Sequence, residues 1–144
     1  MKFDYPETTS ANLWVDNGIL FIRCLPKSII SRTVAEKITD ERIRISQGVS
    51  YPVFMDIRSA KYITMDACNF LKQAEGLQFI SAYAFMFKTH VHGILVNYFL
   101  TINPPALPTM PVSTKEIALN WLKDYKSEAN SSNKISVSNE ALAS

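Results

Sequence analysis

Apolar runs separated by turn signals predict the strands in the middle of the chain. Residues 13–15 and 19–24 flank an Asn-Gly pair, which supplies the positive φ angles of a tight hairpin turn. Residues 51–57 and 80–87 are apolar on both faces, and such runs are typical of strands that are covered on both sides. The pattern therefore predicts an initial hairpin followed by two buried central strands.

Capping signals predict two helices between these strands. Thr33 and Glu36 form a capping-box pattern at the start of the first helix, which we expect over 34–47. Thr64 can cap the second helix, expected over 65–75. A glycine in left-handed conformation commonly ends a helix. The two glycines expected in this role are Gly48 and Gly76.

Two further helices are expected in the second half of the chain. Residues 91–102 have the strongest helical pattern, because their apolar side chains recur at intervals of three and four, and a double proline ends the run. Residues 109–112 suit an edge strand, since an edge tolerates Pro111. The last helix begins at Ser113 or Thr114.

The elements follow one another in the order β-β-α-β-α-β-α-β-α. This alternation predicts a single-domain α/β fold with a mixed, mostly parallel sheet, in which the N-terminal β-hairpin supplies the antiparallel edge. Residues 1–11 lack apolar periodicity, and residues 126–144 hold six Ser and three Asn. We expect an N-terminal extension over 1–11, a folded domain over 12–125 and a flexible tail over 126–144.

Composition narrows the class of protein. The 144 residues are 47% hydrophobic and 19% charged, with a net charge of +2. This near-neutral balance disfavours nucleic-acid binding, which needs a dense basic footprint. No apolar run reaches the ~20 residues of a membrane span, and no signal peptide opens the chain. Cys24 and Cys68 are too few and too far apart for a secreted disulfide framework. We expect a cytoplasmic protein without a membrane span or nucleic-acid partner.

Four stretches stand out together: LWVDNGILFIR (13–23), YPVFMDIR (51–58), NYFLTINPP (97–105) and TKEIALNWL (114–122). With the order of elements, they resemble the STAS-like, or anti-sigma-factor-antagonist-like, family. They are most similar to a group of small uncharacterised bacterial STAS/SEC14-like proteins. The resemblance covers nearly the whole expected domain and implies a STAS-like fold. That narrower group has no assigned activity.

The STAS resemblance also implies where a regulatory site would lie. Members of that family carry a reversibly phosphorylated serine in an Asp-Ser-Ser-Gly type motif, at the start of the helix after the central strand. The corresponding residues here are Thr64, Met65, Asp66, Ala67 and Cys68. Asp66 matches the aspartate of the motif, whereas Ala67 and Cys68 replace its serines. Because the hydroxyl of Thr64 is expected to cap the helix, we predict that this loop accepts no phosphate.

The remaining candidates for chemistry give no catalytic arrangement. His90 and His92 are the only histidines, and a spacing of two points them about 200° apart on a helix, unlike an i, i+4 metal pair. Cys24 and Cys68 lack a zinc spacing; they are expected to be small buried hydrophobes. A place near a helix N-terminus can also lower the pKa of a thiol such as Cys68. With no glycine-rich phosphate loop and no nucleophile elbow, we expect neither an enzyme, nor a cofactor, nor a metal.

Asp56 and Arg58 lie at the carboxyl end of the expected central strand. Ligands of open α/β sheets bind outside that end, so the two residues could form a functional pair. The simpler interpretation is a salt bridge or backbone cap that fixes the loop. The candidate interaction or ligand loop therefore contains Asp56, Arg58, Thr64, Asp66 and Cys68.

Two functions from different classes fit these observations. The first is a non-enzymatic, STAS-like regulatory module that binds a protein partner, for which the resemblance implies a kinase-like anti-sigma factor or another regulator. The second is a carrier or sensor of a small apolar, lipid-like ligand in an aromatic-lined cavity. A buried cavity would favour the carrier, and a dry core with an exposed apolar patch would favour the module.

Self-association is the last expectation. Val96 and Leu100 lie four residues apart and outside the apolar stripe of the helix expected over 91–102, so they share part of its surface. Unless another element covers them, they form an exposed apolar patch. A two-fold symmetric homodimer is the commonest way to cover such a surface. The alternative is that the N-terminal segment, with Phe3 and Tyr5, folds back over it.

Overall fold

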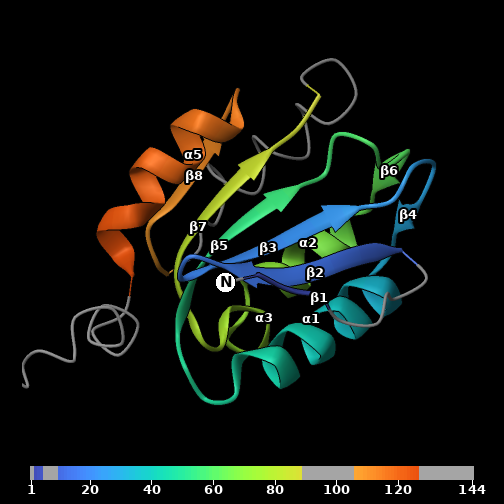
Figure 1. The fold of residues 1–144 in the computed structure, drawn as a ribbon. Coiled ribbons are helices and arrows are strands. Elements are labelled where there is room, and N and C mark those ends of the chain that lie inside the picture. The colour runs from blue at the N-terminus through green and yellow to red at the C-terminus, as the bar shows by residue number, and fades with distance from the viewer. Residues whose placement is uncertain (1, 5–9, 89–105, 127–144) are drawn as a thin grey trace, which may run out of the picture.

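The computed structural model describes residues 2–4, 10–88 and 106–126, and Figure 1 shows their arrangement. Six strands form the main sheet in the order β1-β2-β3-β5-β7-β8. They are β1 (Lys2–Asp4), β2 (Ala11–Asp16), β3 (Ile19–Cys24), β5 (Tyr51–Asp56), β7 (Ile80–Met86) and β8 (Thr109–Val112). A second, two-stranded sheet consists of β4 (Ile29–Ile30) and β6 (Tyr62–Ile63). The helices are α1 (Arg32–Ser46), α2 (Met65–Lys72), α3 (Ala74–Leu77), α5 (Lys115–Leu122) and the 3₁₀ turn η1 (Lys123–Tyr125).

The main sheet is mixed and mostly parallel, which confirms the expected fold class. Strands β2 and β3 form the antiparallel hairpin, and Asn17 and Gly18 make its turn with φ angles of 52° and 77°. Strands β3, β5, β7 and β8 run parallel to one another. The helix expected over 91–102 lies outside the described residues.

Helices lie on both faces of the sheet (Figure 1). On one face, Leu20 and Val53 belong to the larger buried apolar cluster, to which α1 and α2 also contribute. On the other face, Phe21 and Phe54 belong to a smaller cluster that includes Ala118 and other residues of α5. Neighbouring residues of β3 and β5 thus face opposite layers, as the alternation of a strand requires.

Three short strands were not expected from the sequence. Strand β1 falls within the segment interpreted as an N-terminal extension, where it pairs antiparallel with β2. Strands β4 and β6 pair in parallel and link the segment after β3 to the connector after β5. Strands of two or three residues are too short to show a periodicity of two, so only pairing reveals them.

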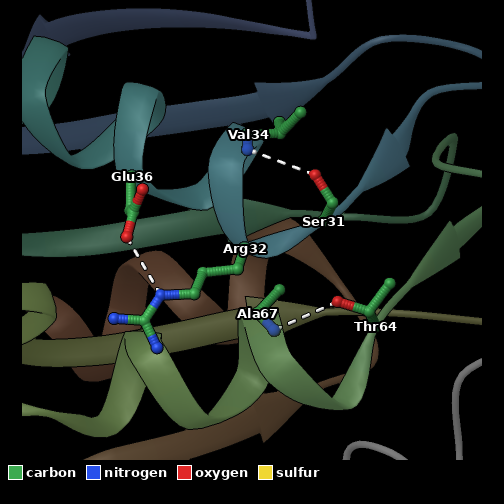
Figure 2. A network of polar contacts seen from close by, with 6 residues as sticks. All are labelled: Ser31, Arg32, Val34, Glu36, Thr64 and Ala67. Carbon is green, nitrogen blue, oxygen red and sulfur yellow. Dashed lines mark hydrogen bonds and ion pairs between the residues drawn. The ribbon is translucent and has the colours of Figure 1, made fainter.

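The start of α1 corrects the expected capping box. Ser31 is the N-cap, and its hydroxyl accepts a hydrogen bond from the backbone N–H of Val34 at 3.3 Å (Figure 2). Thr33 is exposed within the first turn. The Glu36 carboxylate pairs with the Arg32 side chain at 3.0 Å rather than with the backbone. The N-cap of α1 is therefore two residues earlier in the chain than the capping-box pattern predicts. At the other end, Gln47 and Gly48 both have positive φ.

The expected second helix is interrupted, and Gly76 is not its cap. Helix α2 ends at Lys72, Gln73 is extended, and the short helix α3 follows. Gly76 lies inside α3 and is buried. Only a glycine fits there, because a Cβ atom would collide with the carbonyl oxygen of Phe70 and the backbone of Leu71. Close approach of two backbones, rather than a left-handed turn, is thus the role of this glycine.

A buried arginine, which the sequence analysis did not single out, joins α1 to the segment around α3. Arg42 is 2% exposed and donates hydrogen bonds to the carbonyl oxygens of Gln78 (2.6 Å) and Gly76 (3.1 Å). Burial lowers the pKa of Arg42 to about 10, partly offset by the nearby Tyr83, so the side chain stays charged at neutral pH. A cation on the core face of α1 therefore satisfies the carbonyls where α3 ends.

Candidate functional site

The parallel strands β3, β5 and β7 end at one edge of the sheet, and the loops that follow them form the candidate site (Figure 1). The register pairs Arg23 of β3 with Asp56 of β5, and Asp56 with Met86 of β7. Binding sites of open α/β sheets lie outside this carboxyl edge. The structure therefore places the expected Asp56–Arg58 loop at the location where a ligand or partner would approach.

Asp56 and Arg58 form a two-pronged ion pair. The Arg58 Nε and Nη2 atoms lie 3.0 and 2.9 Å from the two carboxylate oxygens of Asp56, and the Arg58 backbone N–H also donates to Oδ1 at 3.0 Å. Burial alone would raise the pKa of Asp56, but these hydrogen bonds, with the charges of Arg58 and Arg23, outweigh it and lower the pKa. The loop-fixing interpretation of the pair is thus the one the geometry supports.

Thr64 caps α2, and the residues at the two serine positions of the motif carry no hydroxyl. The Thr64 hydroxyl oxygen accepts a hydrogen bond from the backbone N–H of Ala67 at 3.1 Å and caps the helix (Figure 2). Asp66 is exposed in the first turn, where a negative charge suits the helix dipole. Ala67 and Cys68, which replace the serines of the motif, are 0% and 4% exposed.

The two cysteines are free and buried. Burial, with a smaller contribution from the charge of Asp56, raises the pKa of Cys24 to about 12. Burial raises the pKa of Cys68 to about 11, although the nearby Lys72 opposes the shift. Desolvation therefore outweighs the lowering that a helix N-terminus can produce, and both side chains behave as small buried hydrophobes, as expected.

A basic groove, lined by Lys27, Arg58, Lys61 and Lys88, lies beside this loop and was missed by the sequence analysis. Its volume is about 640 Å³, and Ile29 also contributes to its lining. The groove could have been predicted from the rule that the carboxyl ends of parallel strands lie at one edge of a sheet. By that rule, the loops after β3 and β7, which carry Lys27 and Lys88, lie near Arg58 in the loop after β5.

An apolar patch, defined by Ile29, Tyr62 and Met65, adjoins the basic groove. These side chains are 52%, 46% and 46% exposed. Ile29 and Tyr62 lie opposite each other in the β4–β6 pair, and Met65 begins α2 three residues after Tyr62. Sequence reasoning missed the patch because both of its strands are only two residues long.

The interior cavity found among the described residues is small. Within the described residues, a cavity of about 30 Å³ lies between the sheet and α2, lined by apolar side chains that include Cys68 and Phe85. That volume suits about one water molecule. The hydroxyl of Tyr83, which also lines it, donates to the sulfur of Met55 at 3.0 Å. Cys68 thus points into the core, where it shares the lining of this cavity with Ile57.

The two histidines and the expected dimer surface cannot be compared with the structure. His90, His92, Val96 and Leu100 lie outside the described residues. Among the residues that are described, no three His, Cys, Asp or Glu side chains form a group that could bind a metal. In the same ranges, no helix has both the length and the apolarity needed to cross a membrane.

Comparison with known proteins places the chain in a family. Residues 13–126 match the family described as "Domain of unknown function (DUF7793)". The chain belongs to this family. No curated protein matches the chain significantly. The matched range begins at the β2–β3 hairpin and ends just after η1, so the family spans nearly the whole described fold.

A solved structure is similar to the chain in fold. It is an uncharacterised protein of the DUF3478 family from Shewanella loihica PV-4, described as having a SpoIIAA-like fold. The two chains share 14% identity over 85% of this chain and 92% of the other, with a TM-score of 0.49. Such a likeness concerns the fold alone.

Proposed function

We propose that the protein is a non-enzymatic regulatory module that binds a protein partner through the apolar patch. The exposure of the patch carries this proposal. Four large hydrophobic side chains are exposed within the described residues, and three of them form the patch, while Ile117 lies apart on α5. Single exposed hydrophobes are ordinary, but neighbouring ones mark contact sites.

The chemistry of the partner follows from what surrounds the patch. The basic groove brings Lys27, Arg58 and Lys61 beside Ile29, and no acidic side chain is among the described residues that line it. A complementary partner surface therefore presents carboxylates around an apolar side chain. The small interior cavity favours this function over a carrier of lipid-like ligands, which needs several hundred cubic ångströms.

In this proposal, partner binding does not depend on phosphorylation of the residues at the start of α2. Ala67 and Cys68 carry no hydroxyl and are buried, and the Thr64 hydroxyl caps α2. We expect the intact mass of the protein, isolated from its own cells, to show no phosphate on residues 58–70. Stoichiometric phosphate mapped to those residues would overturn this part of the proposal.

A pair of matched variants tests the docking surface. Tyr62→Ser removes a patch side chain that is 46% exposed, and Ile117→Ser removes one that is 45% exposed but lies on α5. Partners co-purified with the tagged full-length chain from its own cells are compared by mass spectrometry. We expect one acidic protein to be retained by the wild type and Ile117→Ser but lost with Tyr62→Ser. Equal retention by both variants, or loss from both, contradicts the proposed surface.

We also propose self-association through Val96 and Leu100, which rests on their spacing in the sequence. Light scattering at micromolar concentration is expected to give the mass of two chains, and Leu100→Glu is expected to shift it towards one. A wild-type mass of one chain that does not change on tenfold concentration would rule the dimer out. A dimer that persists in Leu100→Glu would place the interface elsewhere.

A further inference from the structure

A second hollow, the aromatic pocket, lies on the α5 face of the sheet near the carboxyl edge. Its wall consists of Trp14, Phe21 and Phe54 from three neighbouring strands. Trp14 and Phe21 are stacked, with ring centroids 5.2 Å apart and planes 2° from parallel. Phe54 meets Phe21 edge-on at 5.9 Å. Because the strand register pairs these residues in one row, the wall is a fixed apolar surface.

The rim of the aromatic pocket is positively charged. Arg23, Arg58 and Lys115 line it, and Asp56 is its one carboxylate among the described residues. Asp56 is already bound by Arg58. The Lys115 ammonium lies 5.3 Å from the centre of the Phe21 ring. The Arg23 side chain is exposed, and its charge helps to lower the pKa of Asp56.

The volume of the pocket limits the size of its ligand. It encloses about 170 Å³. An engineered apolar cavity of about 150 Å³ in another protein holds one benzene molecule. One six-membered ring therefore matches the volume of the aromatic pocket. A negative group on such a ligand suits the rim, which has three cations and one carboxylate.

We propose that the aromatic pocket binds a small anion that carries a single aromatic ring. The ring lies against Trp14 and Phe21, and its carboxylate or phosphate group is held by Arg23 and Lys115. This ligand site is separate from the docking of a protein on the apolar patch. Arg23 and Lys115 line neither the basic groove nor the apolar patch, so variants at these two positions test the pocket alone.

The experiment uses the ¹⁵N-labelled full chain and follows the indole N–H signals of its two tryptophans. Trp14→Phe identifies the Trp14 signal, and Trp121 on α5 serves as the internal control. Phenyl phosphate and benzoate are titrated separately, so that a phosphate can be told from a carboxylate. Inorganic phosphate and phenol are the controls that carry only the charge or only the ring.

We expect at least one of the two ring anions to shift the Trp14 signal saturably. Its affinity is expected to be about tenfold higher than that of either control compound, because ring and charge are bound together. Lys115→Gln and Arg23→Gln each weaken that binding by about two- to fivefold, the range of a partly exposed charge contact. Lys123→Gln, which makes the same charge change at the far end of α5, leaves it unchanged.

Three results would overturn the proposal. The first is that neither ring anion produces a saturable Trp14 shift at concentrations up to about 10 mM, far weaker than a specific site of this size. The second is that inorganic phosphate binds as well as phenyl phosphate, which reduces the pocket to a patch of charge. The third is that Lys123→Gln weakens binding as much as Lys115→Gln. Circular dichroism of each variant confirms that the fold is retained.

Discussion

Within the described residues, the two faces of the main sheet differ in how completely helices cover them. The face beneath α1, α2 and α3 holds the larger apolar cluster, and the cavity on that side takes about 30 Å³. The face beneath α5 holds the smaller cluster and opens into the aromatic pocket of about 170 Å³. A helix of eight residues is about 12 Å long and about 10 Å wide, so α5 covers two or three of the six strands.

We expect the more completely covered face to contribute more to the free energy of unfolding and the less covered face to contribute more to binding. Side chains on the fully covered face are held by neighbours on every side, and each contributes to the free energy of unfolding. Side chains at the open end of the other face, such as Trp14, are only partly buried. Variants that compare the two faces should therefore differ first in stability.

The largest loss of stability is expected from the covered face. Leu20 on β3 is 0% exposed, and Leu20→Ala should lower the free energy of unfolding by about 2–5 kcal/mol through the cavity it leaves. Leu119 on α5 is half-buried, so Leu119→Ala should cost less than about 2 kcal/mol. Urea denaturation measures both. Equal losses would mean that the two faces are equally well packed.

The next largest effect is expected at Arg42. Arg42→Met keeps most of the side-chain volume but removes the donors to the Gly76 and Gln78 carbonyls, which should cost about 1–3 kcal/mol. Arg44→Met, two residues along on the exposed side of α1, is the matched control and should cost less than about 1 kcal/mol. If Arg42→Met is as stable as Arg44→Met, the carbonyls at the end of α3 have other partners.

A smaller, pH-dependent effect is expected at the carboxyl edge. Arg58→Gln removes the charge that holds the pKa of Asp56 below its ordinary value of 3.8. Because the folded state favours the carboxylate, the ion pair stabilises fully above pH 3.8 and loses its effect as the pH falls through the lower pKa of the folded protein. The Arg58 side chain is 52% exposed, so the loss at pH 7 should stay below about 1 kcal/mol.

Urea denaturation of wild type and Arg58→Gln at pH 7 and below pH 3.8 measures this effect. The stability difference should shrink at the acid pH. A difference that is constant with pH would show that the pair acts by packing rather than by charge.

Removing residues 127–144 should have the smallest effect. The truncation keeps Tyr125, whose carbonyl accepts a hydrogen bond from Ser81, and removes a segment rich in Ser and Asn. We expect the melting temperature to fall by no more than a few degrees. A larger drop, measured by calorimetry, would show that the segment packs on the folded domain.

The fold could be predicted where the sequence carries long patterns. The hairpin over β2 and β3 and the strands β5 and β7 follow from apolar runs and an Asn-Gly turn, and the Thr64 and Thr114 caps follow from residue type. Positions that depend on contacts distant in sequence could not be predicted. In the sequence, Gly76 looks like the end of a helix, and only the structure shows that the backbone of Phe70 lies against it. Strand β4 is too short to show a periodicity of apolar residues.

The candidate site could be predicted only in part, for the same reason. Asp56 and Arg58 are found from a strand end and Thr64 from a capping pattern, and the structure contains the Asp56–Arg58 ion pair and the Thr64 cap. The apolar patch forms only when β4 and β6 pair, 33 residues apart at Ile29 and Tyr62. Chain topology, rather than local pattern, therefore assembles the surfaces proposed here to bind.

The measurement that tests the central claim most directly is the affinity of the purified partner for matched variants of the full chain. Calorimetric titration should give equal dissociation constants for the wild type and Ile117→Ser. It should give a dissociation constant at least about tenfold higher for Tyr62→Ser, as for a central aromatic contact. Equal dissociation constants for all three proteins would contradict docking at the apolar patch.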